Sequence, residues 1–233
     1  MTSCLLLQIS YAVNKQPLFD WYKGLEADNV VIAINCGAEE DTVDMGGIKF
    51  QKDKNFQGGV MSSEGGNQRW VMPNTEVYHT ERWSDSDFSY QVPMDKNEDA
   101  EYVLILKFSE QYFDESGGKV FDVSIGDTTI IKNLDIWQRV GARWLPHDEF
   151  VSLKTERGDL FINGKKVNKA ITNNKLTINF LKGKADNPKI NALVLVKGQL
   201  EDTHHKSHEA YKQTLIDIQQ EKALARAQAE QLF

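Results

Sequence analysis

The stretch that most constrains the fold is a run of seven residues near the middle of the chain, 102–108, with the sequence YVLILKF. Its apolar residues are nearly continuous, and its length and β-rich composition are those of a strand. Strands buried inside β-sandwiches have this composition, whereas half-exposed strands alternate apolar and polar residues. The run therefore predicts a central strand of a β-sandwich.

An aromatic loop and a second strand follow this run. Residues 109–114 place Tyr112 and Phe113 side by side among polar and acidic neighbours. The sequence SGG at 116–118 predicts a turn, and residues 119–123 alternate as a half-buried strand does. Aromatic side chains displayed on a loop above a rigid sheet are typical of a binding surface.

Short strand patterns recur along the rest of the chain, separated by Gly, Asn and Pro. Two dipeptides predict hairpin turns, Gly126-Asp127 and Asn163-Gly164. Residues 53–68 are polar, contain two glycine pairs and predict a long loop. The other predicted strands are 30–35, 46–50, 76–83, 87–93, 128–132, 149–153, 159–162, 175–180 and 190–197. This spacing, without intervening helical periodicity, predicts an all-β fold, an antiparallel β-sandwich or jelly roll.

The character of the sequence changes near residue 201. Residues 208–233 contain no Gly or Pro and are rich in Ala, Gln, Glu, Lys and Leu, which predicts a C-terminal α-helix. Apolar residues recur there at steps of three and four, as in a weak heptad. We therefore expect an N-terminal extension over 1–28, a β-sandwich domain over 29–200 and a helical attachment segment over 201–233.

Composition and charge narrow the classes of partner and compartment. The formal net charge of −7 argues against nucleic acid and anionic membranes as the main partner. Two cysteines do not make a disulfide scaffold. No stretch approaches the roughly 18 apolar residues that a membrane helix needs. A cytoplasmic protein is expected, and a chain shortened by its signal and anchor, from the lumen of the endoplasmic reticulum, would look the same.

Catalytic and metal-binding patterns find little support. His204 and His208 have the i, i+4 spacing of metal ligands, but a solvated helix start is the favoured interpretation. Ser109, His79 and Asp114 could be drawn as a triad, although no local signature accompanies them. The glycine pairs match no phosphate-binding pattern. The sequence predicts no catalytic residue, metal or cofactor, and hence no enzyme.

The aromatic residues give a better indication of function. A sugar ring has an apolar face that stacks on aromatic side chains and hydroxyl groups that bind carboxylates and amides. Trp83, Tyr112 and Phe113 lie at predicted strand ends or loops, and Asp186-Asn187 could supply the polar partners. The alternative interpretation is that these aromatics pack at the rim or in the core.

At these residues the chain resembles the malectin domain. The resemblance runs in order from about residue 30 to residue 200. Its segments are AINCG at 33–37, GIKF at 47–50, YHTERW at 78–83, FSYQVP at 88–93, residues 102–113, KVFDV at 119–123, LDI at 134–136 and DNPK at 186–189.

The resemblance implies a jelly-roll, carbohydrate-binding module of the galactose-binding-like type, without catalytic activity. The family's founding lectin, of the endoplasmic reticulum, recognises an α-linked diglucose unit with aromatics and an aspartate. By this match Trp83 replaces a binding Tyr, Tyr112 and Phe113 fall on the family's Tyr-Phe pair, and Asp186 falls on the sugar-binding aspartate. Glu64 occupies the place of another binding Tyr, so one wall of the pocket is lost and the choice of glycan stays open.

Two functional hypotheses follow. The first is a glycan-binding module with a glucose-containing oligosaccharide as its ligand. The second is a structural protein of a cytoplasmic, cytoskeletal or ciliary assembly, in which the sandwich is a docking scaffold and residues 204–233 engage a protein partner. Malectin-type domains also occur in plant receptor kinases and on some kinesin motors.

Overall fold

A computed structural model describes residues 27–44, 47–63 and 76–199. The predicted C-terminal helix, most of the predicted N-terminal extension, His204, His208 and Glu64 lie outside these residues. The predicted domain boundaries stay predictions, because most of the predicted extension over 1–28 and all of segment 201–233 lie outside the described residues. No helix in the described part has the length and hydropathy needed to span a membrane.

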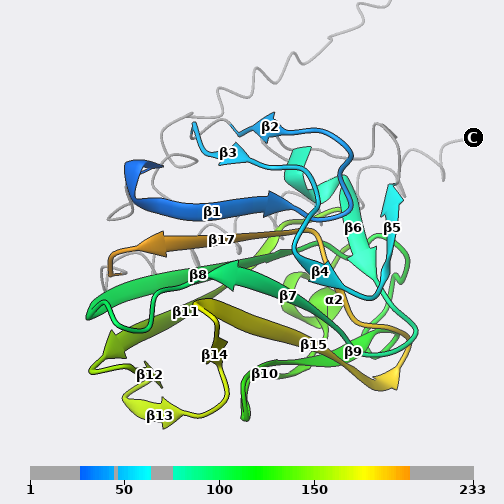
Figure 1. The fold of residues 1–233 in the computed structure, drawn as a ribbon. Coiled ribbons are helices and arrows are strands. Elements are labelled where there is room, and N and C mark those ends of the chain that lie inside the picture. Colours follow the sequence, from blue (N-terminus) through cyan, green and yellow to red (C-terminus); the bar gives the residue numbers. More distant parts are fainter. Residues whose placement is uncertain (1–26, 45–46, 64–75, 200–233) are drawn as a thin grey trace, which may run out of the picture.

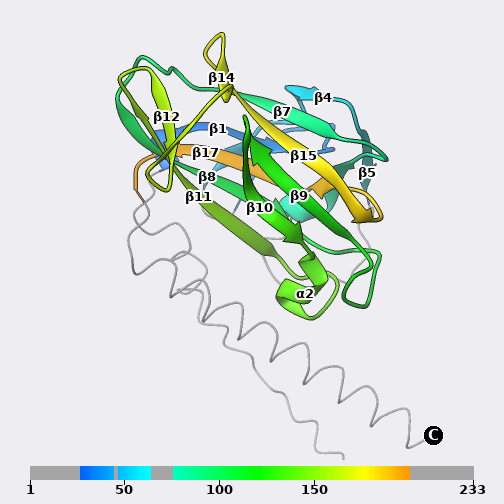
Figure 2. The same cartoon turned by 90° about the horizontal axis from the view of Figure 1, so that it is seen from below.

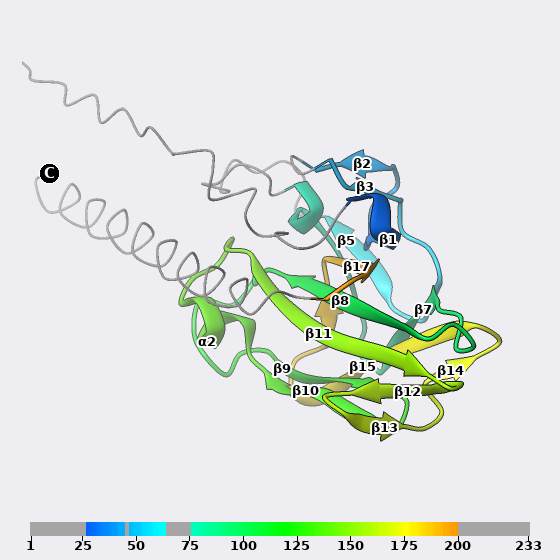
Figure 3. The same ribbon diagram turned by 90° about the vertical axis from the view of Figure 1, so that its left-hand side faces the viewer.

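Two antiparallel sheets pack face to face (Figures 2 and 3), with β8 and β11 in one layer and β9 and β15 in the other. The first sheet has the order β1 (Val30–Asn35), β17 (Ala192–Lys197), β8 (Ala100–Phe108), β11 (His147–Glu156), β12 (Asp159–Ile162) and β13 (Lys165–Val167). The second has the order β10 (Thr128–Leu134), β9 (Val120–Ile125), β15 (Lys175–Ala185), β7 (Phe88–Pro93) and β4 (Phe56–Gln57), with β14 (Ile171–Thr172) also paired to β15. The predicted antiparallel β-sandwich is confirmed.

Two smaller sheets complete the fold (Figure 1). β16 (Lys189–Ile190), β6 (Thr80–Trp83) and β5 (Val60–Ser63) form a three-stranded sheet, which we call the small sheet. β2 (Thr42–Val43) pairs with β3 (Lys49–Phe50) beyond β1. The helical elements are η2 (Ala27–Asn29), η3 (Glu76–Tyr78) and α2 (Ile136–Val140).

The near-continuous apolar run of β8 follows from burial of both its faces. Tyr102, Leu104, Leu106 and Phe108 belong to the main core between the two sheets. Val103 and Ile105, which alternate with them, belong to a second apolar cluster on the outer face, under side chains that include Phe50, Val77 and Tyr78. Each fully buried aliphatic or aromatic side chain contributes about 1.5–3 kcal/mol. Because successive strand residues face opposite ways, two cores require apolar residues at nearly every position.

Local turn chemistry is largely as predicted. The Gly126-Asp127 turn joins β9 to β10, and the Asn163-Gly164 turn joins β12 to β13. Asn163 and Gly164 have φ values of 50° and 73°, the left-handed region that a two-residue type I′ turn requires. Helix α2 begins after Asp135, whose side chain accepts a hydrogen bond from the Gln138 N–H, and ends at Gly141.

Two predicted segments differ in the structure. Residues 76–83, predicted as one strand, form η3 and then β6, because Val77 and Tyr78 both turn into the outer apolar cluster. Residues 53–68, predicted as a long loop, contain β4 and β5. Both strands are short and pair at sheet edges, so they carry little of the apolar periodicity that identifies a strand.

Asn191 divides the predicted strand 190–197 into β16 and β17 and joins the small sheet to the main one. Its Oδ1 accepts from the Ser109 N–H at 2.8 Å, and its Nδ2 donates to the carbonyls of Tyr78 (3.0 Å) and Thr80 (2.8 Å). Its own N–H donates to the Lys107 carbonyl and its carbonyl accepts from the Cys36 N–H. Asn191 is fully buried, so the chain changes sheets here with its polar groups hydrogen-bonded.

Candidate functional site

The small sheet provides the floor of a cavity. Trp83 on β6 is the direct partner of Lys189 on β16 and of Val60 on β5, and Glu81 is the direct partner of Ser62. Directly opposed residues of antiparallel strands project from the same face, and so do residues two apart on one strand. Trp83, Glu81 and their partners therefore share one face, whereas Arg82 turns to the other face and binds Asp53.

Two loops form the walls. The segment after β8 carries Glu110 to Phe113, and the turn between β15 and β16 carries Asp186 and Asn187. The cavity between floor and walls has a volume of about 320 Å³. We call it the aromatic cavity, and it is lined by Ser62, Glu81, Trp83, Glu110, Gln111, Tyr112, Lys119, Asp186, Asn187 and Lys189.

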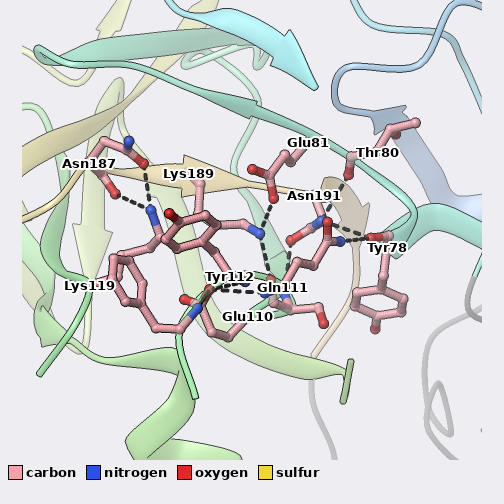
Figure 4. A network of polar contacts seen from close by, with 12 residues as sticks. Tyr78, Thr80, Glu81, Glu110, Gln111, Tyr112, Lys119, Asn187, Lys189 and Asn191 are labelled. Atoms are coloured by element: carbon pink, nitrogen blue, oxygen red, sulfur yellow. Dashed lines mark hydrogen bonds and ion pairs between the residues drawn. The ribbon is translucent and has the colours of Figure 1, made fainter. Parts of the chain in front are cut away.

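Glu110 holds the aromatic loop in place (Figure 4). Its Oε1 accepts three hydrogen bonds from successive main-chain N–H groups, those of Gln111 (3.0 Å), Tyr112 (2.8 Å) and Phe113 (3.1 Å). Its own carbonyl accepts from the Trp144 N–H at 2.9 Å. Hydrogen bonds to an ionised acceptor are stronger than neutral ones, and this carboxylate is almost fully buried. The loop is therefore fixed by the residue that begins it.

The two loop aromatics lie differently. Tyr112 is 77% exposed, the largest exposure among the large hydrophobic side chains of the described chain. Phe113 meets it edge to face, with ring centroids 5.0 Å apart. Gly118 lies under Phe113, where a Cβ atom would come within 2.5 Å of the ring. Phe113 therefore supports the loop from behind, and Tyr112 presents its ring to the cavity mouth.

A buried lysine organises the opposite wall. Lys119, at the start of β9, forms an ion pair with Asp186 and donates to both the main-chain carbonyl (3.2 Å) and the side-chain Oδ1 of Asn187. Asp186 has a φ of 53°, a conformation that Asp and Asn adopt more readily than most residues. The ion pair thus stabilises a turn that presents a carboxylate to the cavity.

A second buried lysine lies in the floor. Lys189 forms an ion pair with Glu81 on β6, and its ammonium donates to the Ser109 carbonyl at 2.5 Å. Figure 4 shows Lys189 reaching Glu81 while Lys119 reaches Asn187. Gln111 is also committed to the framework, because its Nε2 donates to the Tyr78 carbonyl at 2.5 Å. Most polar groups around the cavity are therefore held by protein partners.

The residues singled out in the sequence converge here. Trp83, Tyr112 and Asp186 line the aromatic cavity, and Phe113 packs against Tyr112. Glu64, the fifth family position, lies outside the described residues. Sequence reasoning missed Glu81, Glu110, Lys119 and Lys189, which look like ordinary polar positions of strands and loops until their distant partners are known.

The structure adds no support for the Ser109–His79–Asp114 triad or for a metal site. Ser109 is fully buried, and its hydroxyl has no hydrogen-bond partner among the described residues, unlike an activated nucleophile. Burial lowers the pKa of His79, with Glu76 opposing the shift. Within residues 27–44, 47–63 and 76–199, no three His, Cys, Asp or Glu side chains gather as metal ligands would.

Comparisons with known proteins give one family. A sequence model of the malectin domain matches residues 30–193. The chain is 40% identical to malectin of Danio rerio over 181 residues and 38% identical to malectin of Homo sapiens over 180 residues. These alignments cover 76% and 75% of the chain but only 61% and 59% of the relatives, so the chain spans about three fifths of their length.

A solved structure shares the fold. The ANX2 ectodomain from Arabidopsis thaliana superposes with a TM-score of 0.59 at 18% identity, covering 73% of this chain and 50% of that one. At this identity the likeness concerns the β-sandwich alone.

Proposed function

This chain belongs to the malectin domain family, and on that premise we propose that it is a non-catalytic carbohydrate-binding module. Its ligand is a glucose-containing oligosaccharide, bound in the aromatic cavity. The observation that carries the proposal is the convergence of Trp83, Tyr112 and Asp186, from three separate segments, on one cavity of about 320 Å³. This volume is at the lower end of the ~300–1,000 Å³ typical of small-molecule sites.

The chemistry of the cavity suits a sugar. The rings of Trp83 and Tyr112 are partly or largely exposed and offer apolar faces on which the C–H face of a pyranose can stack. The carboxylate of Asp186 offers acceptors for hydroxyl groups, and hydrogen bonds to charged acceptors contribute about 1.5–3 kcal/mol each. Because loop and turn are held by Glu110 and Lys119, little conformational entropy is lost when a ligand binds.

The role of Trp83 in binding is tested by titrating the purified protein with α-linked glucose disaccharides and following tryptophan fluorescence. We expect saturable binding in the native protein and a loss of affinity of at least about tenfold in Trp83→Ala, since both stacking and pocket shape are lost. Phe161→Ala is the matched control, because Phe161 is a partly exposed aromatic that pairs within the β11–β12–β13 part of the main sheet and does not line the cavity.

Two results would contradict the proposal. One is the absence of binding to any sugar in a broad glycan panel by a protein that unfolds cooperatively. The other is equal affinity for the native protein and Trp83→Ala, with Phe161→Ala also unchanged, because the aromatic cavity would then not be where the sugar binds.

A further inference from the structure

The two ion pairs that line the aromatic cavity, Lys119–Asp186 and Lys189–Glu81, have the same orientation. The side chains of Lys119 and Lys189 are 7% and 1% exposed, whereas those of their partners Asp186 and Glu81 are 33% and 17% exposed. In each pair the ammonium lies inside the protein and the carboxylate reaches the cavity. Each pair therefore presents its negative end to a ligand.

The lysines have little capacity left to bind a ligand. An ammonium group has three N–H donors. Those of Lys119 meet three acceptors, one from Asp186 and two from Asn187. Lys189 donates to Glu81 and to the Ser109 carbonyl, and its side chain is too deeply buried to reach a bound molecule. Among the lining residues that the structure describes, an anionic substituent would thus find no free ammonium.

The other residues that line the cavity do not offset the negative charge of Asp186 and Glu81. The described part of the lining contains three carboxylates and two ammonium groups, a net charge of −1. The third carboxylate, Glu110, is bound to three main-chain N–H groups. Ser62 contributes a neutral hydroxyl beside Glu81, and Trp83 and Tyr112 contribute apolar rings and single donors. The groups open to a ligand are therefore mainly hydrogen-bond acceptors of negative charge.

We propose that Glu81 is a ligand-contacting, specificity-determining residue of the aromatic cavity. Together with Asp186, it makes the site accept hydroxyl or ammonium groups and reject carboxylates. The class of ligand is then a neutral or amino sugar, and uronic acids and other acidic sugars are excluded. This inference rests on the proposed function, since it concerns selectivity at the same site.

The test compares three matched probes on the native protein: an α-linked glucose disaccharide, its 2-amino-2-deoxy analogue and its analogue oxidised to glucuronic acid at the terminal ring. We expect the amino sugar to bind at least as tightly as the neutral one, and the glucuronide to bind at least about tenfold more weakly. Raising the salt concentration to 0.5 M should narrow the gap between neutral and acidic probes, because salt screens charge repulsion.

A double variant tests whether the Glu81–Lys189 pair in the cavity floor causes the discrimination against the acidic sugar. Glu81→Gln/Lys189→Gln replaces the ion pair by two amides without leaving a bare buried charge. It should reduce the discrimination against the glucuronide, and the Phe161→Ala protein should retain it. If the double variant does not fold, Glu81→Gln takes its place, because its amide oxygen still accepts from the Lys189 ammonium, and the discrimination against the glucuronide should again be reduced.

The outcomes separate the two proposals. Binding of the glucuronide as tight as, or tighter than, the neutral disaccharide overturns the selectivity while carbohydrate binding stands. A native preference for neutral sugars that a folded variant of the pair keeps in full overturns the role of Glu81, while the selectivity and carbohydrate binding stand. Failure of all three probes and of a glycan panel removes the proposed function and this inference with it.

Discussion

Two lysine–aspartate pairs of this protein have the same chemistry and opposite settings. Lys107 on β8 and Asp148 on β11 are direct cross-strand partners, with side chains 3% and 1% exposed. Lys119 and Asp186 pair within one wall of the aromatic cavity, where the aspartate is one-third exposed. We call Lys107–Asp148 the sealed pair, because both side chains are buried. We call Lys119–Asp186 the open pair, because its carboxylate is accessible from the cavity.

The sealed pair lies on the outer face of the main sheet. The Lys107 ammonium donates to Asp148 at 2.6 Å and to the Tyr78 hydroxyl at 3.2 Å, and Tyr78 donates to Asp148 at 2.7 Å. Breaking such a pair is costly because it leaves a charge in a medium of low polarity. The open pair instead shares its carboxylate with the cavity. Burial of the acid, and not the ion pair itself, therefore separates a contact that only stabilises the fold from one that also faces the cavity.

The largest effect is expected for Asp148→Ala. Removing the acid takes the Asp148 carboxylate away from the buried Lys107 ammonium, so the free energy of unfolding should fall by about 3–5 kcal/mol. Urea unfolding followed by circular dichroism measures it. Lys107→Met/Asp148→Leu, which removes both charges, should lose less than the single variant. A loss below about 1 kcal/mol for Asp148→Ala would contradict the view that the buried Lys107–Asp148 pair stabilises the fold more than the Lys119–Asp186 pair does.

Glu110→Ala should affect both stability and binding. It removes the acceptor of three main-chain N–H groups, and leaving buried donors unpaired costs about 1–3 kcal/mol. The released loop should also reduce disaccharide affinity. Glu110→Gln retains an acceptor oxygen. Its free energy of unfolding, measured in urea, and its disaccharide affinity, measured by fluorescence titration, should lie between those of the native protein and Glu110→Ala. Unchanged stability of Glu110→Ala would show that the loop is held by other contacts.

Asp186→Ala should separate binding from stability. Its carboxylate is one-third exposed, and Lys119 keeps its contacts with Asn187, so the free energy of unfolding should fall by less than the ~3–5 kcal/mol expected for Asp148→Ala. Disaccharide affinity should fall by about tenfold or more, since a charged acceptor is lost. A loss of stability as large as that of Asp148→Ala would make the two pairs equivalent and remove the distinction between them.

Tyr112→Ala should have the smallest effect on stability. The side chain is largely exposed, so the free energy of unfolding should change by less than about 0.5 kcal/mol. Loss of one stacking face should weaken disaccharide binding by about 1 kcal/mol, or roughly fivefold. Isothermal titration calorimetry gives the affinity, and full binding by this variant would assign Tyr112 a role outside the site.

Local patterns predicted much of the fold. The apolar run of β8, the two hairpin turns and the alternation in β9 depend on neighbours in sequence, and all three are present in the structure. Tyr112 and Phe113 could be singled out because aromatics among polar residues are conspicuous in a sequence.

The ion pairs could not be predicted in the same way. The partners Lys119 and Asp186 are 67 residues apart, and Lys189 and Glu81 are 108 apart. Nothing local distinguishes these residues from solvated charges on strands. Their pairing depends on the order of strands in the sheets, which brings β6, β9 and β16 to one end of the sandwich. The same holds for η3, where packing into the outer cluster overrides a strand-like pattern.

The position of Asn191 has a consequence for the rigidity of the site. Its five hydrogen bonds tie β16 and β6 to β8 and β1, so the cavity floor cannot separate from the core without exposing several polar groups at once. Floor and core should therefore open as a single cooperative unit, and amide protons of β6 should exchange with solvent as slowly as those of β8. The proposed binding site would then be preformed, and its sugar would bind by lock and key.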